Sequence, residues 1–437
     1  MLMLYLKQAW QLLKQNKLYS SVYILGTGMA IAVVMTIAII YYIKIAPVYP
    51  EVNRNRTLVG KNMMIKYTKS GAMSSSLYSW NFVKEHLYTL KSAEAVSAVL
   101  SVWDDYPLVR LPNEKGMLPV TVAYTDHHYW QVFGFEFLHG KPFSEADFES
   151  GIKTTVITKS LANILFGTVE AEGKYVELDG NDYRVSGVVR DVSFAAKETY
   201  AQLWVPFTVK PEAIANTGKS EGTALLGALK VFILAPTASA TAAVAAEAEG
   251  IIKQINAAQE KYVADMSGQP EAYWKSVFRQ SNNNRIDWAE IIQSLGFILL
   301  ALLIIPAVNL AGMVSSRMEK RLAEMGVRKS FGASRGVLLW QVLVENLLLT
   351  TLGGLLGLVL SFVIMYCGRS WILGVFDRWQ EVPPEGISSF FDAGMFFNPV
   401  VFFIALAVCF VLNLLSAIIP AYNGLRKNIV VSLNHNK

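Results

Sequence analysis

Four long apolar segments are separated by polar stretches along this chain. They lie within residues 19–45, 285–314, 337–366 and 398–422. An α-helix rises ~1.5 Å per residue, so ~20 apolar residues cross the ~30 Å hydrocarbon core of a bilayer. The pattern therefore predicts a membrane protein with four transmembrane helices. Pro306 predicts a kink in the second of them.

Charged residues beside these segments predict how the helices are oriented. Residues 1–18 show helical apolar spacing and carry Lys7, Lys14 and Lys17, which is typical of an amphipathic helix on a membrane surface, although the n-region of a cleaved signal peptide has the same charge. Basic residues also dominate 315–336 and the tail 423–437, whereas 367–397 is mainly acidic. The positive-inside rule then places both termini and 315–336 in the cytoplasm.

Residues 46–284 have the composition of a soluble domain, and the predicted topology places them outside the cytoplasm. Alternating positions favour strands at 154–158, 174–178, 183–189 and 228–234, with a hairpin turn at 179–182. Helical patterns cover 78–90 and 238–266. We therefore predict a large α/β (α+β) domain of two subdomains, inserted between the first two membrane helices. One subdomain would combine 48–143 with 225–284, and the other would be 144–224.

Polar residues flank this domain at both of its connections to the membrane. Residues 49–54 follow the first apolar segment, and residues 282–290 precede the second. Neither stretch is apolar enough to lie in lipid. We expect each to continue its membrane helix outward, so that the two extensions form a stalk under the domain.

Composition narrows the class of protein further. Hydrophobic residues make up 53% of the 437 residues, charged residues 17%, and the net charge is +5. This modest charge lies mostly beside the apolar segments, which indicates membrane topology and lipid contact rather than nucleic-acid binding. The two cysteines, Cys367 and Cys409, have no metal-ligand spacing and provide no disulfide framework for the soluble domain.

Two short motifs suggest chemistry that their context does not support. His127 and His128, with His139 nearby, are candidate metal ligands, but adjacent residues on a strand point to opposite faces, so solvated surface histidines are favoured. Gly218-Lys219-Ser220 ends like a phosphate-binding loop, yet Ala213 stands where the first glycine is required. We expect no catalytic, metal-binding or cofactor-binding residues on this chain.

The third apolar segment carries features that suggest helix packing. Glu345 and Asn346 lie about two turns from its start. An ionisable residue inside a membrane helix usually has a functional role or a charged partner. We favour the interpretation that Glu345 reaches back to the arginines of 315–336. Gly353 and Gly357 form a small-xxx-small pattern that permits close helix approach or dimerisation, although glycine is also common in membrane helices.

Residues 324–335 read Glu-Met-Gly-Val-Arg-Lys-Ser-Phe-Gly-Ala-Ser-Arg. This stretch resembles the acidic-Ile-Gly-Ile-Arg-Lys/Arg-x-Leu-Gly-Ala-x-Arg signature of FtsX-like, MacB-type ABC transporter permeases. Residues 139–147, 156–167 and 183–191 are similar to the periplasmic domain of that family. The resemblance implies a coupling segment at 315–336 that contacts a cytoplasmic ABC ATPase through Arg321, Glu324, Met325, Gly326, Val327, Arg328, Lys329, Gly332 and Ala333.

The resemblance also implies partners and location. ATP and Mg would bind the partner ATPase, a second permease copy or paralogue would complete a dimer, and membrane-fusion or outer-membrane proteins would be further partners. The chain would lie in the bacterial inner membrane with its large domain in the periplasm. ATP hydrolysis would drive that domain by mechanotransmission, for efflux of antibiotics or peptides. Lipoprotein release, activation of cell-wall hydrolases, and an uncoupled receptor or scaffold are the alternatives.

Overall fold

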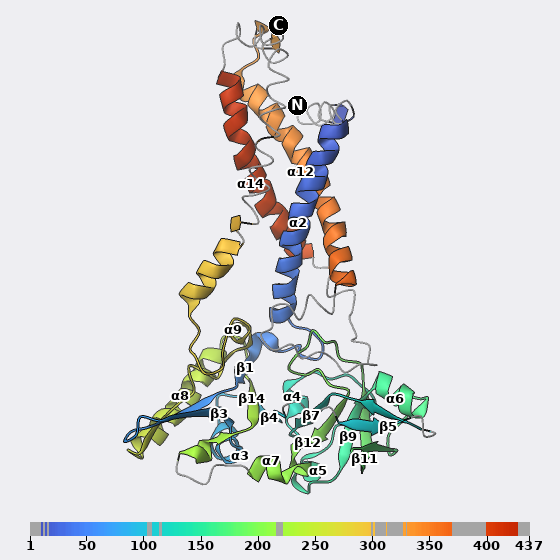
Figure 1. Ribbon diagram of the computed structural model, residues 1–437, viewed down its shortest axis with the longest axis vertical. Coiled ribbons are helices and arrows are strands. Elements are labelled where there is room, and N and C mark those ends of the chain that lie inside the picture. Colours follow the sequence, from blue (N-terminus) through green and yellow to red (C-terminus); the bar gives the residue numbers. More distant parts are fainter. Residues whose placement is uncertain are drawn as a thin grey trace. The chain divides into compact units, whose positions relative to one another are not determined.

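The computed structural model describes residues 10, 11, 14, 17–102, 107–112, 116–215, 222–298, 300, 301, 312, 327, 328, 330–368 and 399–426 (Figure 1). Two compact units divide the chain. The first comprises 1–42, 288–372 and 393–437, and the second comprises 43–287 and 373–392. The division falls inside one helix, α2, whose last turn belongs to the second unit.

The longest described helices of the first unit are α2 (Lys17–Ile45), apart from its last turn, α12 (Arg335–Cys367) and α14 (Pro399–Arg426). They correspond to the first, third and fourth predicted membrane helices. Length and composition make α2 and α12 candidate membrane spans. Within the second predicted helix, 288–298, 300, 301 and 312 are helical, and its other residues lie outside the described part. The count of four spans stays a prediction.

A sixteen-stranded sheet organises the second unit. Along it the strands follow the order β15-β2-β3-β14-β4-β7-β12-β9-β11-β10-β5-β6, and β1, β8, β13 and β16 pair beside this path. The strands are β1 (Thr57–Gly60), β2 (Met63–Tyr67), β3 (Met73–Tyr78), β4 (Ala95–Leu100), β5 (Leu108–Arg110), β6 (Met117–Pro119), β7 (Val122–Thr125), β8 (Phe137–Gly140), β9 (Thr154–Thr158), β10 (Tyr175–Leu178), β11 (Asn181–Val189), β12 (Leu203–Pro206), β13 (Leu226–Gly227), β14 (Leu229–Leu234), β15 (Tyr262–Asp265) and β16 (Glu271–Ala272).

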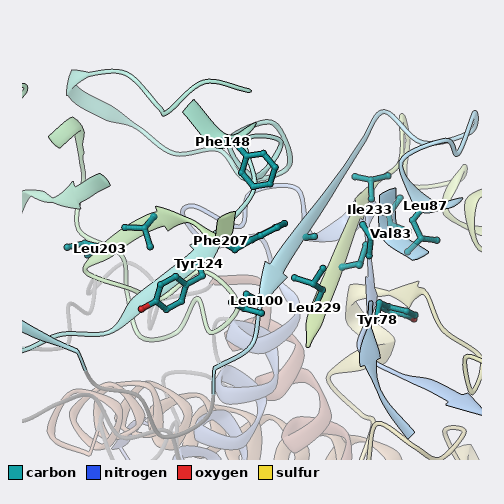
Figure 2. Close-up of a cluster of buried hydrophobic side chains, with 14 of the residues drawn as sticks. Tyr78, Val83, Leu87, Leu100, Tyr124, Phe148, Leu203, Phe207, Leu229 and Ile233 are labelled. Atoms are coloured by element: carbon teal, nitrogen blue, oxygen red, sulfur yellow. The ribbon is translucent and has the colours of Figure 1, made fainter. Parts of the chain in front are cut away.

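Short helices cover this sheet. The helix α8 packs on β1, β15 and β16, while α6 packs on β9 and β11. The helical elements are η1 (Arg54–Arg56), α3 (Trp80–Phe82), η2 (Val83–Leu87), α4 (Tyr129–Val132), α5 (Glu145–Glu149), α6 (Lys159–Phe166), η4 (Phe207–Val209), α7 (Pro211–Ala215), η5 (Thr223–Leu225), α8 (Thr241–Ala257) and α9 (Tyr273–Ser276). Figure 2 shows part of the apolar core between sheet and helices, including Tyr78, Leu100, Phe148, Phe207 and Ile233.

The four predicted strands are confirmed as β9, β10, β11 and β14. The predicted hairpin turn joins β10 to β11, and Asp179 and Gly180 have φ values of 48° and 74°. Two adjacent residues with positive φ are characteristic of a type I′ turn, whose twist matches that of paired strands.

Both predicted helices of the soluble domain were too long. The α8 helix ends at Ala257, because the Asn256 side chain bonds the backbone of Ala264 and residues 262–265 pair with β2 as β15. Residues 78–90 contain the short α3, capped by Ser79, and one π-helical turn, η2. Pairing with a distant strand outweighs local helix propensity after Ala257, and Tyr78 belongs to β3, where it pairs with Leu226 and Leu229.

The predicted stalk is wrong for the described residues next to the domain. The first membrane helix ends at Ile45, where Pro47 and Pro50 remove backbone donors that a continuing helix needs. Residues 282–287 are also not helical, whereas 288–290 are helical and continue into 291–298 as predicted. The predicted subdomains differ too, because β5, β6 and β8, from residues 108–140, lie with β10 and β11 rather than with β1–β4. Both connections are compact and bonded to the domain.

Candidate functional site: the two connections to the membrane helices

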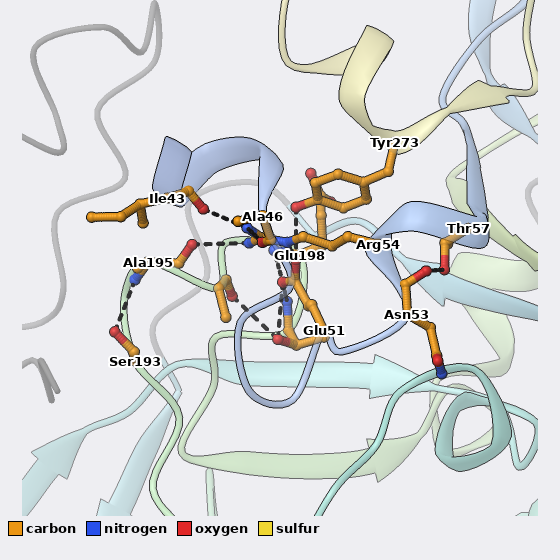
Figure 3. A network of polar contacts seen from close by, with 12 residues as sticks. Ile43, Ala46, Glu51, Asn53, Arg54, Thr57, Ser193, Ala195, Glu198 and Tyr273 are labelled. Carbon is orange, nitrogen blue, oxygen red and sulfur yellow. Dashed lines mark hydrogen bonds and ion pairs between the residues drawn. The ribbon is translucent and has the colours of Figure 1, made fainter. Parts of the chain in front are cut away.

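A buried ion pair lies where the chain leaves α2. The Glu51 carboxylate and the Arg54 guanidinium are 2.7 Å apart, and their side chains are 0% and 1% exposed. Arg54 also donates to the carbonyl oxygens of Ile43 and Ala46 at 2.5 and 2.8 Å. These carbonyls end α2, and a cation there is favoured by the helix dipole. Figure 3 shows the guanidinium between them and Glu51.

The same pair is bonded to two segments that are distant in sequence. Arg54 donates to the Ala195 carbonyl at 3.1 Å, and Glu51 accepts from the backbone and hydroxyl of Thr199 at 3.1 and 3.0 Å. The Tyr273 hydroxyl donates to Glu51 at 2.6 Å, and its ring centroid lies 4.8 Å from the guanidinium. Burial, followed by the Glu51 carboxylate, raises the pKa of Tyr273, which keeps this donor protonated. We call Glu51, Arg54, Thr199 and Tyr273 the Arg54 cluster.

A second buried ion pair lies where the chain returns toward the membrane helices. The Arg279 guanidinium binds the Glu271 carboxylate through two bonds of 2.6 and 2.9 Å. It also donates to the carbonyls of Ser267 and Asn284. The Gln269 side chain donates to the Asn282 carbonyl at 3.0 Å. We call Glu271 and Arg279, with these carbonyls, the Arg279 cluster.

The two clusters are joined through short secondary-structure elements. Strand β1 follows Arg54 and pairs with β16, so that Val59 lies opposite Glu271. Tyr273, two residues beyond Glu271, belongs to the Arg54 cluster. The outgoing and returning segments are therefore fastened to each other as well as to the sheet.

Much of the predicted coupling segment 315–336 lies outside the described residues. Its described residues include Val327 and Arg328, which are helical, and Gly332, which has a φ of 88°. Ala333 N–H donates to the Arg328 carbonyl at 3.0 Å, which is the long bond of a Schellman helix end. Predicted contact residues outside the described part are Arg321, Glu324, Met325, Gly326 and Lys329.

The start of α12 is bonded to this turn. Arg328 donates to the Gln341 side chain at 2.8 Å, and Gln341 is buried. The sequence favoured Glu345 as the partner of the arginines. The structure places Glu345 among buried residues one turn further along α12 and shows Gln341 as a partner of Arg328. Gln341 was not identified from the sequence, since an amide in an apolar segment carries no charge signal.

Gly353 and Gly357 lie where α12 approaches α2 in the same chain. A Cβ atom on Gly353 would lie 2.9 Å from the Thr27 Cβ, and one on Gly357 would lie 2.8 Å from the Gly28 carbonyl oxygen. Both distances are shorter than van der Waals contact, so only glycine fits there without displacement. The dimer role of these glycines stays a prediction.

The histidine pair packs against the core, so the prediction of solvated surface histidines is wrong. The rings of His127 and His128 are 3.9 Å apart, and His127 also contacts Phe148. Asp126 beside them is fully buried, and its carboxylate accepts from Ser97, Tyr88 and two backbone amides. Among the described residues, no group of three or more His, Cys, Asp and Glu side chains is placed to hold a metal ion.

Two protein families match different parts of this chain. Residues 20–251 match the MacB-like periplasmic core domain, and residues 275–429 match the FtsX-like permease C-terminal family. Among solved structures, the extracellular domain of the YknZ transporter from Gram-positive bacteria is 18% identical, with a TM-score of 0.32, over 47% of this chain and 99% of that one. The periplasmic region of MacB from Actinobacillus actinomycetemcomitans is 15% identical, with a TM-score of 0.31, over 47% of this chain and 87% of that one.

The relatives of this chain include permeases and proteins that combine an ATP-binding part with a permease. The chain is 22% identical over 282 residues to an uncharacterized ABC transporter permease, YknZ, of Bacillus subtilis, covering 64% of this chain and 66% of that one. It is 22% identical over 308 residues to the macrolide export ATP-binding/permease protein MacB of Chromobacterium violaceum, covering 70% and 42%. A pyoverdine export ATP-binding/permease protein, PvdT, of Pseudomonas aeruginosa is 22% identical over 288 residues, covering 62% and 41%.

The chain thus spans less than two thirds of the length of each of these three relatives. One family match alone covers more than half of the 437 residues, and the second covers most of the C-terminal part. The signature at 324–335 lies within that second match. The chain therefore belongs to the FtsX-like, MacB-type family of ABC transporter permeases.

Proposed function

We propose that this permease couples ATP hydrolysis by a separate cytoplasmic ATPase to movement of its large domain outside the membrane, and that the movement drives export. Two relatives are named for macrolide and pyoverdine export, and both names include an ATP-binding part. The given sequence has no complete phosphate-binding loop, since Ala213 replaces the required glycine. We assign the hydrolysis to a partner chain because this chain belongs to a family of permease subunits.

The Arg54 cluster is the observation that supports this proposal most directly. It fastens the last turn of α2 to the loop between β11 and β12 and to α9. Breaking a buried ion pair by removing one partner costs ~3–5 kcal/mol, several times thermal energy. A displacement of the last turn of α2 would therefore move the domain instead of bending the connection.

Copurification tests the ATPase contact. The full chain is co-expressed with a candidate ABC ATPase subunit from the same genome, and the complex is isolated in lipid nanodiscs. Glu324→Lys and Gly326→Trp change predicted contact residues, whereas Arg110→Gln alters an exposed ion pair with Glu177 and serves as control. We expect the first two variants to lose the ATPase and its stimulated turnover. Retention of both by these variants contradicts the docking proposal, as does a wild-type chain that purifies alone.

Arg54→Met tests transmission separately from docking. The variant should retain the bound ATPase, because Arg54 belongs to the second unit and the coupling segment belongs to the first. In the wild type, trapping the ATPase with ADP and vanadate should change hydrogen exchange of residues 43–54 and 193–199. This change should be lost in Arg54→Met and kept in Arg110→Gln. An unchanged response in Arg54→Met would refute transmission through the cluster.

The export part of the proposal has its own readout. Cells carrying the wild-type complex should show lower accumulation of a macrolide or peptide substrate than cells carrying Glu324→Lys. Equal accumulation, together with intact ATPase coupling, would refute export and leave lipoprotein release or hydrolase activation as the outcome. Release of lipoproteins from spheroplasts, or of cell-wall fragments, would then distinguish these two.

A further inference from the structure

Helix α9 presents an aromatic and a basic side chain to solvent. Its first residue, Tyr273, is buried in the Arg54 cluster, whereas Trp274 is 42% exposed and Lys275 is exposed. The Lys275 ammonium lies 5.7 Å from the centroid of the Trp274 ring. Tryptophan is enriched where a protein meets the membrane–water interface.

This helix lies directly beside the last turn of α2. One nitrogen of Arg54 is 2.5 Å from the Ile43 carbonyl oxygen, and the guanidinium carbon of the same side chain is 4.8 Å from the Tyr273 ring centroid. In Figure 3 the Arg54 guanidinium lies between the Ile43 carbonyl and the Tyr273 ring. A single buried guanidinium therefore separates the end of α2 from α9.

The length of α2 fixes the level of its last turn in a bilayer. The helix has 29 residues, which gives a length of about 43 Å at ~1.5 Å per residue. A bilayer including its headgroup layers is ~40–45 Å thick. Lys17 begins the helix and Lys44 lies in its last turn, and no charged residue stands between them. A helix of this length, charged only at its two ends, can cross the bilayer with its last turn in a headgroup layer.

We propose that α9 is a membrane-surface contact of the large domain. Trp274 places its indole in the interface between headgroups and acyl chains, and Lys275 binds the phosphate of an anionic headgroup. The positive charges of Lys44 and Lys275 complement such a surface. Lipid contact thereby holds the domain at a fixed height beside the Arg54 cluster. The inference concerns the chain in its bilayer and is independent of the ATPase.

Depth-dependent fluorescence quenching tests this contact. The full chain, with Cys367 and Cys409 replaced by serine, receives one cysteine by Trp274→Cys and carries an environment-sensitive fluorophore there. Nanodiscs contain phosphatidylcholine and phosphatidylglycerol with a fraction of lipid spin-labelled at the headgroup. Tyr175→Cys, at an exposed site on β10, is the matched control in the same domain, and Tyr42→Cys on α2 reports insertion.

We expect the label at residue 274 to be quenched several times more strongly than the label at 175. Lys275→Glu should reduce that quenching, more in phosphatidylglycerol-rich nanodiscs than in phosphatidylcholine alone. A second variant, Lys275→Cys, gives an independent label should Trp274→Cys unfold the domain. The proposal is overturned if the folded labels at 274 and 275 are quenched no more than the control while the label at 42 is quenched.

Discussion

Replacing Arg54 by methionine should destabilise the large domain more than almost any other single change outside its apolar core. Methionine keeps most of the aliphatic length of arginine but removes its charge and donors. The Glu51 side chain, which is 0% exposed, would then carry a buried negative charge with no cation beside it. The carbonyls of Ile43 and Ala46 would lose the donor that they share.

The expected loss follows from this burial. Removing one member of a buried ion pair costs ~3–5 kcal/mol. For a domain of 150–250 residues, each kcal/mol shifts Tm by ~2–4 °C, so the expected decrease is ~6–20 °C. The total stability of a domain is ~5–15 kcal/mol, so the variant should still fold at low temperature.

Thermal unfolding of the full chain in nanodiscs measures this shift. Intrinsic fluorescence reports on the second unit because Trp204 is fully buried there. Arg110→Gln is the control, since Arg110 and Glu177 form a pair at the surface, where ion pairs contribute ~0–1 kcal/mol. The double variant Glu51→Gln/Arg54→Met should recover part of the loss, because it leaves no buried charge. The reasoning is wrong if Arg54→Met melts within error of Arg110→Gln, or if the two changes are additive.

Three further changes test other parts of the structure. Burial, followed by the neighbouring His128, lowers the pKa of His127 from 6.5 to about 4. The native state therefore excludes a proton that the unfolded state binds, so the free energy of unfolding should fall as pH drops from ~6.5 to ~4. His127→Gln should flatten this dependence in unfolding midpoints measured between pH 7.5 and 5. Gly332→Ala should lower the free energy of unfolding by about 1 kcal/mol, because the φ of this residue is 88°. The control is Gly336→Ala, which lies in regular helix with open space around it and should show no loss of stability in a matched thermal scan. Gly353→Ala should cost ~1–3 kcal/mol against the same control, because its Cβ would lie 2.9 Å from Thr27, and equal melting of the two variants would refute close packing of α2 and α12.

The strongest periodic signals predicted structure that formed largely as expected. Strand β9 is buried at all five positions, and its run of threonine, valine and isoleucine fits a strand inside a sheet. The turn at Asp179 and Gly180 could be predicted from the sequence because aspartate and glycine tolerate positive φ. The residue at which α8 ends could not be predicted from the sequence. It depends on hydrogen bonds between the Asn256 side chain and the Ala264 backbone and on the pairing of β15 with β2.

Less of the candidate site than of the fold could be predicted from the sequence. Glu51 and Arg54 lie in a polar stretch after an apolar segment, and that polarity favoured a helical extension beyond the lipid. Their partners Thr199 and Tyr273 are about 150 and 220 residues away, so no local pattern connects them. The usable signal was Pro47 with Pro50, which excludes a continuing helix. It predicts that the charges beyond these prolines turn back onto the domain.

The placement of the buried charges is itself an argument about function. A buried ion pair contributes little net stability compared with apolar residues of the same volume. The Arg54 and Arg279 clusters nevertheless occupy the two points where the domain meets the chain from the membrane helices. Apolar contacts are non-directional and allow neighbouring segments to slide, whereas guanidinium bonds to carboxylates and helix carbonyls fix both distance and orientation. Directional bonds at these two points are what the proposed transmission of movement from α2 to the domain requires.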